Sequence, residues 1–96
     1  MRVMVRYRIK PEHVQQNLDA LSAVYEELES IRPDWLSYST YQLEDTVSFV
    51  ALVVVDDPGR LGAFPAFRAY RSSLEQRCDE PPVTTEVRQV GAFGRD

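Results

Sequence analysis

Asn17 is the polar residue whose position most strongly suggests a chemical role. At about 100° per residue it falls within the apolar stripe of a predicted helix, between Val14 and Leu28 in angle. A buried amide must be hydrogen-bonded, because unpaired burial costs about 1–3 kcal/mol. Asn17 is therefore either a structural group bonded to a strand or loop carbonyl, or a polar group facing a cavity. We take it as the candidate catalytic residue.

Two arginines near the N-terminus are candidates for binding an anion. Arg6 and Arg8 alternate with the apolar residues of a predicted strand, so they face away from its apolar side, toward a dimer interface or its rim. An arginine inside a cavity would suit an anionic or enolate-forming ligand. An ion pair with Glu86 or another acid across the interface is the alternative.

Aromatic residues in both halves of the chain could line a pocket for a flat apolar ligand. Together with Arg6, the predicted ligand-binding residues are Trp35, Tyr38, Phe67 and Tyr70. Tyr41 is a further aromatic of this kind. Aromatics at these spacings also fill cores and interfaces, and that alternative stays open.

Other kinds of site find little support. His13 is the sole histidine, placed in the first turn of a predicted helix with no cysteine or carboxylate at metal-ligand spacing, so we expect no metal and no cofactor. Ligation of haem by this lone histidine is the alternative. No spacing supports a Ser-His-Asp arrangement, and no glycine-rich loop is present to cradle phosphate.

Length and composition limit the class of protein. Ninety-six residues predict one domain spanning 1–96, with 44% hydrophobic and 27% charged residues as in ordinary globular proteins. The net charge of −4 argues against a nucleic-acid or anionic-membrane partner. The lone Cys78 cannot form an intramolecular disulfide, and arginines interrupt the N-terminus where a signal peptide would be apolar. A cytoplasmic location is expected.

Hydrophobic periodicity and turn residues predict the elements that position these side chains. Their order is strand, helix, strand, strand, helix, strand, over residues 2–9, 11–32, 35–43, 46–55, 63–80 and 83–90. Cys78 falls on the apolar stripe of the second helix and is expected to be a core residue. With right-handed crossovers, this order predicts an α+β, ferredoxin-like fold: a four-stranded antiparallel sheet with two helices on one face.

The segment 46–55 is apolar on both of its alternating faces. Two helices cover about one face of a sheet of this width, so the other face lacks a cover within the chain. We therefore predict a homodimer in which the sheets of two copies pack face to face.

At the level of residues, the chain resembles the antibiotic biosynthesis monooxygenase-like members of the dimeric α/β-barrel superfamily. The likeness covers essentially the whole chain and is carried by Arg6-Tyr7-Arg8-Ile9-Lys10-Pro11, Gln16-Asn17, Arg32-Pro33, Tyr38, Leu43-Glu44-Asp45, Ser48-Phe49-Val50, Phe64-Pro65-Ala66-Phe67 and Arg77-Cys78-Asp79-Glu80-Pro81-Pro82.

Two functions follow from this resemblance and from the residues. The resemblance implies an oxidoreductase: a cofactor-independent monooxygenase, or a related enzyme, acting on a flat apolar or aromatic substrate between helices and sheet. The alternative is a non-catalytic homodimeric module that binds a small molecule or has a structural role. The absence of an acid–base constellation favours the alternative, as does Ala51, where relatives often carry histidine.

Overall fold

The computed structural model describes residues 1–94 and has the predicted order of strands and helices. The strands are β1 (Arg2–Ile9), β2 (Ser37–Gln42), β3 (Ser48–Val54) and β4 (Cys78–Glu86); the helices are α1 (Val14–Ile31) and α2 (Pro65–Arg77). All strand pairs are antiparallel, in the order β2-β3-β1-β4. The ferredoxin-like fold is thereby confirmed, with β1 and β3 as the central pair.

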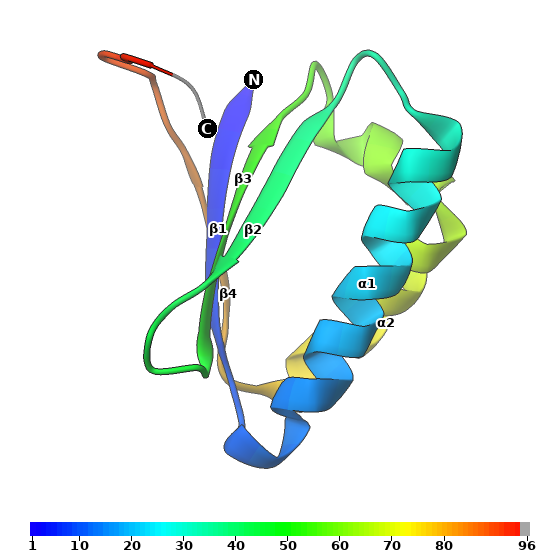
Figure 1. Ribbon diagram of the computed structural model, residues 1–96, viewed down its shortest axis with the longest axis vertical. Coiled ribbons are helices and arrows are strands. Elements are labelled where there is room, and N and C mark those ends of the chain that lie inside the picture. Colours follow the sequence, from blue (N-terminus) through cyan, green and yellow to red (C-terminus); the bar gives the residue numbers. More distant parts are fainter. Residues whose placement is uncertain (95–96) are drawn as a thin grey trace.

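Both helices lie on the same face of the sheet (Figure 1). The residues that β1 and β3 direct toward the helices are buried, among them Tyr7, Ile9, Phe49 and Val53. The alternate residues form the opposite face, which nothing in residues 1–94 covers; we call it the open face. Leu52, at the centre of this face, is 40% exposed. In residues 1–94 no helix has the length and apolar character needed to span a membrane.

A two-residue turn between the predicted strands 35–43 and 46–55 puts Gln42 and Phe49 on the same face of the sheet, and the β2–β3 hairpin has this predicted pairing. Gln42 pairs with Phe49 and Ser37 with Val54, which is the register of a turn centred on Asp45-Thr46. Thr46 has a positive φ of 69°, and the Asp45 carboxylate accepts hydrogen bonds from the backbone N–H groups of Val47 and Ser48. These bonds hold the left-handed residue in place, so the turn keeps the Phe49 side of β3 toward the helices.

Prolines define the limits of the helices. α1 ends where Arg32 adopts a left-handed conformation and donates its N–H to the Leu28 carbonyl at 2.7 Å, immediately before Pro33. α2 begins at Pro65, whose missing N–H costs nothing in the first turn. A short 3-10 helix over Pro11–His13 precedes α1, and another over Pro58–Ala63 precedes α2.

The predicted boundary between the second helix and the last strand is wrong. α2 ends at Arg77, and β4 starts with Cys78 and continues through Pro81 and Pro82, whereas we expected a helix up to these prolines and a strand over 83–90. β4 is an edge strand, so prolines are tolerated where no neighbour needs the N–H group, and its pairing with β1 shifts register in this region. Cys78 is buried as expected, but on a strand, and burial raises the pKa of its thiol.

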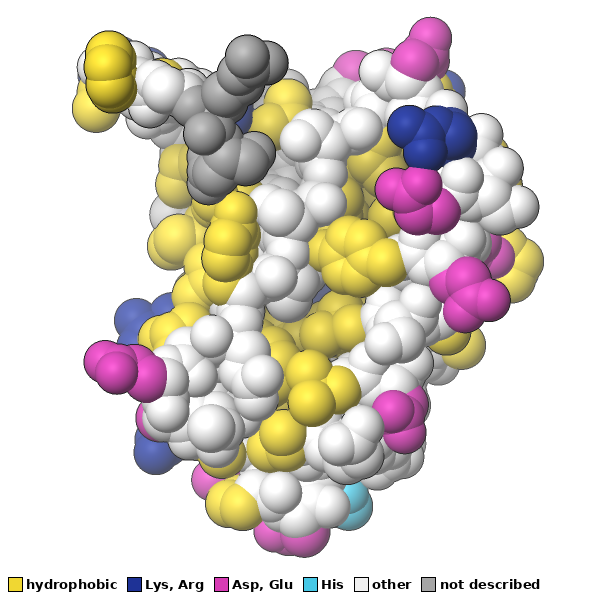
Figure 2. All heavy atoms as spheres, in the orientation of Figure 1, with side chains coloured by type: hydrophobic (Ala, Val, Ile, Leu, Met, Phe, Trp, Pro, Cys, Tyr) yellow, Lys and Arg dark blue, Asp and Glu magenta, His cyan; other side chains and the backbone are white. Residues whose placement is uncertain are grey.

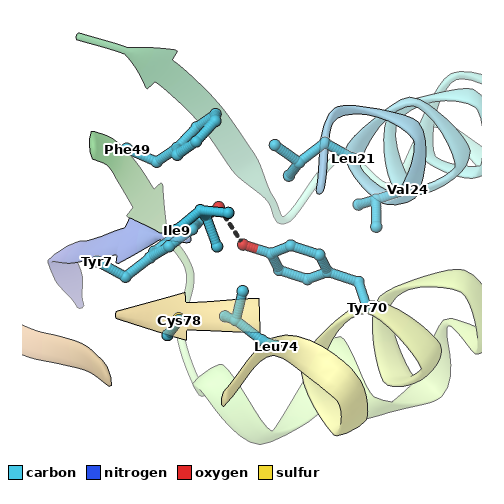
Figure 3. Close-up of a cluster of buried hydrophobic side chains, with 8 residues drawn as sticks. All are labelled: Tyr7, Ile9, Leu21, Val24, Phe49, Tyr70, Leu74 and Cys78. Atoms are coloured by element: carbon cyan, nitrogen blue, oxygen red, sulfur yellow. Dashed lines mark hydrogen bonds between the residues drawn. The ribbon is translucent and has the colours of Figure 1, made fainter. Parts of the chain in front are cut away.

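A close-packed cluster of side chains joins the sheet to the helices. Leu74 on α2 is fully buried in this cluster with Ile9, Leu21, Val24 and Phe49 (Figure 3). Burial of this kind is the main favourable contribution to the stability of a domain this small.

Truncating the centre of this cluster should destabilise the fold strongly. We expect Leu74→Ala to lower the free energy of unfolding by about 2–5 kcal/mol, because it removes buried methyl groups and leaves a cavity. Urea denaturation followed by circular dichroism measures the effect. The exposed Ser72→Ala on the same helix is the control; equal losses for the two variants would contradict the assigned core.

Candidate functional site

The candidate site is a cavity of about 240 Å³ between the sheet and α2. Its lining residues are Val3, Val5, Tyr7, Tyr38, Ala51, Val53, Pro58, Leu61, Phe67, Tyr70, Arg71 and Thr84. The surface is mainly apolar and aromatic, with polar groups only on the three tyrosines, Arg71 and Thr84. Apolar side chains also gather in the hollow visible between the sheet and the helices in Figure 2. Such a lining suits a small, flat, mostly apolar molecule.

Two tyrosines of the cavity wall are joined through their hydroxyl groups. The Tyr70 hydroxyl on α2 lies 2.6 Å from the Tyr7 hydroxyl on β1 (Figure 3). Asn17 on α1 donates from Nδ2 to the same Tyr7 oxygen at 3.2 Å. Three elements distant in sequence therefore converge on one oxygen atom, which fixes the position of the Tyr7 side chain.

Arg77, the last residue of α2, holds the other end of Asn17. Its Nε and Nη2 atoms donate to Asn17 Oδ1 at 3.3 and 3.2 Å, and Nη1 donates to Ser73 Oγ at 2.6 Å. Arg77 is 3% exposed, and no carboxylate in residues 1–94 lies within ion-pair distance of its guanidinium. Its position at a helix C-terminus, where Nη2 also donates to the Tyr70 carbonyl, partly offsets the cost of burying the charge.

Burial raises the pKa of both hydroxyls, and their mutual hydrogen bond shifts the two pKa values in opposite directions. Burial raises the pKa of Tyr7, but the hydrogen bonds that its oxygen accepts from Asn17 and Tyr70 lower it. Burial is the largest cause that raises the pKa of Tyr70, the neighbouring Tyr7 and Tyr38 raise it next, and the bond that Tyr70 donates raises it further. Tyr7 is thus the more acidic hydroxyl of the pair, and both are protonated at neutral pH.

The structure brings three of the predicted ligand-binding residues into the cavity wall. Tyr38, Phe67 and Tyr70 all line it, with ring centroids 6.1 Å apart between Tyr38 and Phe67 and 6.2 Å between Phe67 and Tyr70. Trp35 is not among the lining residues. It stacks on Phe64 at 5.7 Å and lies under the Arg60 guanidinium, 3.9 Å from its ring centroid.

The three predicted polar residues, Asn17, Arg6 and Arg8, lie outside the cavity wall. Arg6 is on the open face, paired across the sheet with Val50, and so faces away from the cavity. Glu86 pairs with Val3 and lies on the helix side of the sheet, so Arg6 and Glu86 are not partners within one copy. Asn17 is fully buried behind Tyr7, with both ends of its amide hydrogen-bonded. A catalytic role for Asn17 stays a prediction, and any such role acts through Tyr7.

Residues that sequence reasoning overlooked complete the site. Neither Tyr7 nor Arg77 is among the site residues predicted from the sequence. A hydroxyl on an otherwise apolar strand face was the available signal for Tyr7, since a buried phenol needs a partner. Ala51 contributes to the cavity because a small side chain at the centre of β3 leaves space beside the larger neighbours. No group of three His, Cys, Asp or Glu residues within 1–94 is arranged to hold a metal ion.

A second hollow, of about 400 Å³, adjoins the cavity at Tyr38. It lies at the C-terminal end of α1 and is lined by Tyr25, Leu28, Glu29, Arg32, Pro33, Asp34, Leu36 and Tyr38. The Tyr25 hydroxyl and Thr40 Oγ1, 2.7 Å apart, tie α1 to β2 beside it. Because Tyr38 belongs to both hollows, its ring forms part of the wall between them.

Asn17 should be required for stability through Arg77. We expect Asn17→Leu to lower the free energy of unfolding by about 1.5–3 kcal/mol, because the buried guanidinium loses a hydrogen-bond acceptor. Asn17→Asp keeps that acceptor and should lose much less. Chemical denaturation of both variants at neutral pH tests this. An Asn17→Leu protein as stable as the wild type would show that the contact with Arg77 contributes nothing.

Comparisons with known proteins show the same architecture in solved structures. The chain is similar to a Bacteroides thetaiotaomicron protein named as a candidate antibiotic biosynthesis monooxygenase (TM-score 0.79, 14% identity, 100% of this chain and 94% of that one). A Nitrosomonas europaea protein with the same description gives 0.76 at 15% identity, over 97% and 92% of the two chains. A conserved protein of Methanosarcina mazei gives 0.70 at 20% identity, over 88% and 86%.

Sequence comparison adds no closer relative. No family model matches the chain, and no curated protein matches it. At these identities the likeness to solved structures establishes the fold alone. The chain thus has the ferredoxin-like fold of solved proteins described as antibiotic biosynthesis monooxygenases.

Proposed function

We propose that this protein belongs with the antibiotic biosynthesis monooxygenase-like proteins, binds a compact flat molecule in the cavity between the sheet and α2, and oxidises it without a cofactor. The observation that carries the proposal is the cavity itself: an apolar, aromatic-walled space of about 240 Å³ in a fold shared with proteins described as such monooxygenases. Three aromatic residues expected from the sequence to bind the ligand line this space.

The size of the cavity limits the ligand. At about 30 Å³ per water molecule, the volume corresponds to roughly eight waters, below the roughly 300–1,000 Å³ typical of drug-sized ligands. A molecule of one or two fused rings fits this space. A three-ring molecule requires a side chain to move, and Tyr38 is suited to do so because the larger hollow lies on its other side.

The proposed reaction needs little from the protein beyond a dry, shaped pocket. A substrate that loses a proton to form a carbanion reacts with O₂ directly. One oxygen atom enters the product as a carbonyl, and the other leaves as water with the two hydrogens of the oxidised carbon. The substrate supplies all the electrons. An apolar wall excludes water from the reacting carbon, and hydrogen-bond donors stabilise the charge that develops.

The chemical types of the lining side chains favour a second function. Among the twelve residues that line the cavity there is no carboxylate, imidazole or amine to remove a proton. A non-catalytic module that binds the same class of molecule needs no such base. The two functions share the ligand and the cavity, and differ in whether bound ligand consumes oxygen.

Turnover of a two-ring phenol distinguishes the monooxygenase from the non-catalytic binding module. 1-Naphthol plus O₂ gives 1,4-naphthoquinone plus water, and anthrone plus O₂ gives anthraquinone plus water. We expect the enzyme to accelerate oxygen uptake and quinone absorbance with 1-naphthol more than with anthrone, because the smaller molecule fits the cavity. Binding of 1-naphthol with oxygen uptake no faster than in buffer would support the non-catalytic module.

Filling the cavity should abolish binding without unfolding the protein. Ala51→Leu adds a larger apolar side chain at the centre of the cavity wall, so we expect affinity for 1-naphthol to fall at least tenfold while circular dichroism is unchanged. Ala69→Leu makes the same change at an exposed position of α2 and should bind normally. Isothermal titration calorimetry measures both. Unchanged affinity in Ala51→Leu would place the ligand elsewhere.

We also propose that the open face is covered by a second copy of the chain. The face carries Met4, Tyr41, Val50, Leu52, Val54 and Val83, of which Leu52, Tyr41 and Val83 are 40%, 51% and 62% exposed. An apolar surface of this kind is unusual for a monomer, and a face-to-face homodimer buries it on both copies.

A charge at the centre of the open face should separate the copies. We expect Leu52→Asp to shift the protein from dimer to monomer at micromolar concentration, because two carboxylates would be buried opposite each other. Ser72→Asp, on the solvent side of α2, should leave the dimer intact. Light scattering coupled to size-exclusion chromatography reports the mass. A monomeric wild type would refute the proposed interface.

A further inference from the structure

We infer that the Tyr7–Tyr70 hydroxyl pair presents one hydrogen-bond donor to the cavity, and that the ligand is a compact aromatic ketone, or its enolate, whose oxygen accepts this bond. The inference rests on the proposed use of the cavity for ligand binding. It adds which group contacts the ligand, which part of the ligand it contacts, and which residues position it.

The first step is that chemistry fixes which atoms of the hydrogen-bond network donate and which accept. A guanidinium can only donate hydrogen bonds, so the Asn17 atom 3.2–3.3 Å from Arg77 must be the carbonyl oxygen Oδ1. The other end of the amide is then the NH₂ group, which can only donate. Tyr7 Oη, 3.2 Å from Nδ2, must therefore be an acceptor in that contact.

The second step is a count of hydroxyl hydrogens. Tyr7 and Tyr70 carry one hydroxyl hydrogen each, and the single contact between the two oxygens, at 2.6 Å, uses one of them. Asn17 cannot accept the other, because it presents its NH₂ group. No other acceptor for either hydroxyl lies within hydrogen-bond distance in residues 1–94. One phenolic hydrogen is therefore left over, whichever tyrosine donates to the other.

The third step is where this hydrogen can go. Both tyrosines line the cavity, and both side chains are otherwise buried, at 2% and 3% exposure. An acceptor for the spare hydrogen must therefore come from inside the cavity: water in the empty protein, and an oxygen of the ligand in the complex. A ketone oxygen accepts such a bond, and an enolate oxygen accepts it more strongly because it is charged.

The surroundings favour Tyr7 as the donor and favour negative charge on the ligand. Tyr7 is the more acidic hydroxyl of the pair, since its oxygen receives two hydrogen bonds, and the buried Arg77 cation also lowers its pKa. No carboxylate lines the cavity to oppose an anion. Tyr7 is the group that touches the ligand; Asn17, Tyr70 and Arg77 are positioning residues that aim its hydrogen into the cavity.

One substitution redirects the spare hydrogen with little change in shape. In Asn17→Asp, the carboxylate accepts from Arg77 at one oxygen and has only acceptors to offer Tyr7, so the Tyr7 hydroxyl turns to donate to it. Tyr70 still donates to Tyr7, and no hydroxyl hydrogen remains for the cavity. In Tyr70→Phe, by contrast, Asn17 still donates to Tyr7, whose own hydrogen stays available to the ligand.

The test compares 1-indanone with indane, the same bicyclic skeleton without the oxygen. Isothermal titration calorimetry on the wild type, Tyr70→Phe and Asn17→Asp gives the ratio of the two affinities for each protein, with folding checked by circular dichroism. We expect the wild type and Tyr70→Phe to prefer the ketone by about two- to tenfold, the range of a single net hydrogen bond. Asn17→Asp should bind both probes equally.

Every other outcome of this test refutes either the donor assignment or the cavity proposal. Retention of the ketone preference in Asn17→Asp, or equal binding of the two probes by the wild type, refutes the donor assignment while leaving the cavity as a binding site. Failure of both probes to bind the wild type refutes the cavity proposal, and this inference with it. If Asn17→Asp does not fold, the wild type and Tyr70→Phe still decide, because both retain the spare hydrogen and must prefer the ketone.

Discussion

The structure depends on a buried cation that no acid in residues 1–94 neutralises. Arg77 ends α2 inside the protein, and its guanidinium is satisfied by the side chains of Asn17 and Ser73 and by the Tyr70 carbonyl. A charge in this position is costly unless every donor has a partner, so the surrounding groups are held in one arrangement. Through Asn17 this constraint reaches Tyr7 on the central strand, and through Tyr7 it reaches Tyr70. One network thereby connects α1, α2 and β1.

This network also decides the character of the cavity beside it. A cavity walled only by Val, Leu, Phe and Ala side chains would bind any apolar molecule of the right size. The tyrosine pair adds polar side chains to this wall, and Arg77 sets the direction of their hydrogen bonds through Asn17. Hydrogen bonds from residues that do not contact the ligand hold a hydroxyl in one orientation and keep it from rotating toward water.

Much of this arrangement was readable in the chain. The alternation in β1, the doubly apolar β3 and the helical stripes led to the correct order of elements, and the parity of the β2–β3 hairpin led to the correct faces. The end of α2 was misplaced, because Cys78 continues the helical stripe while Pro81 and Pro82 look like a stop signal. Edge position, which makes those prolines acceptable in a strand, is a property of the sheet and not of the local sequence.

The sequence predicted only part of the candidate site, because the site also depends on how separate elements pack. Tyr38, Phe67 and Tyr70 were predicted as aromatics that could line a pocket for a flat ligand, and the fold brings them to one cavity. Trp35 was predicted on the same ground and packs elsewhere. Sequence periodicity determined the fold class and the burial of Asn17, since both follow from local spacing of apolar residues. Only tertiary structure decided that Asn17 meets Tyr7 and Arg77, because contacts over ten and sixty positions depend on how separate elements pack.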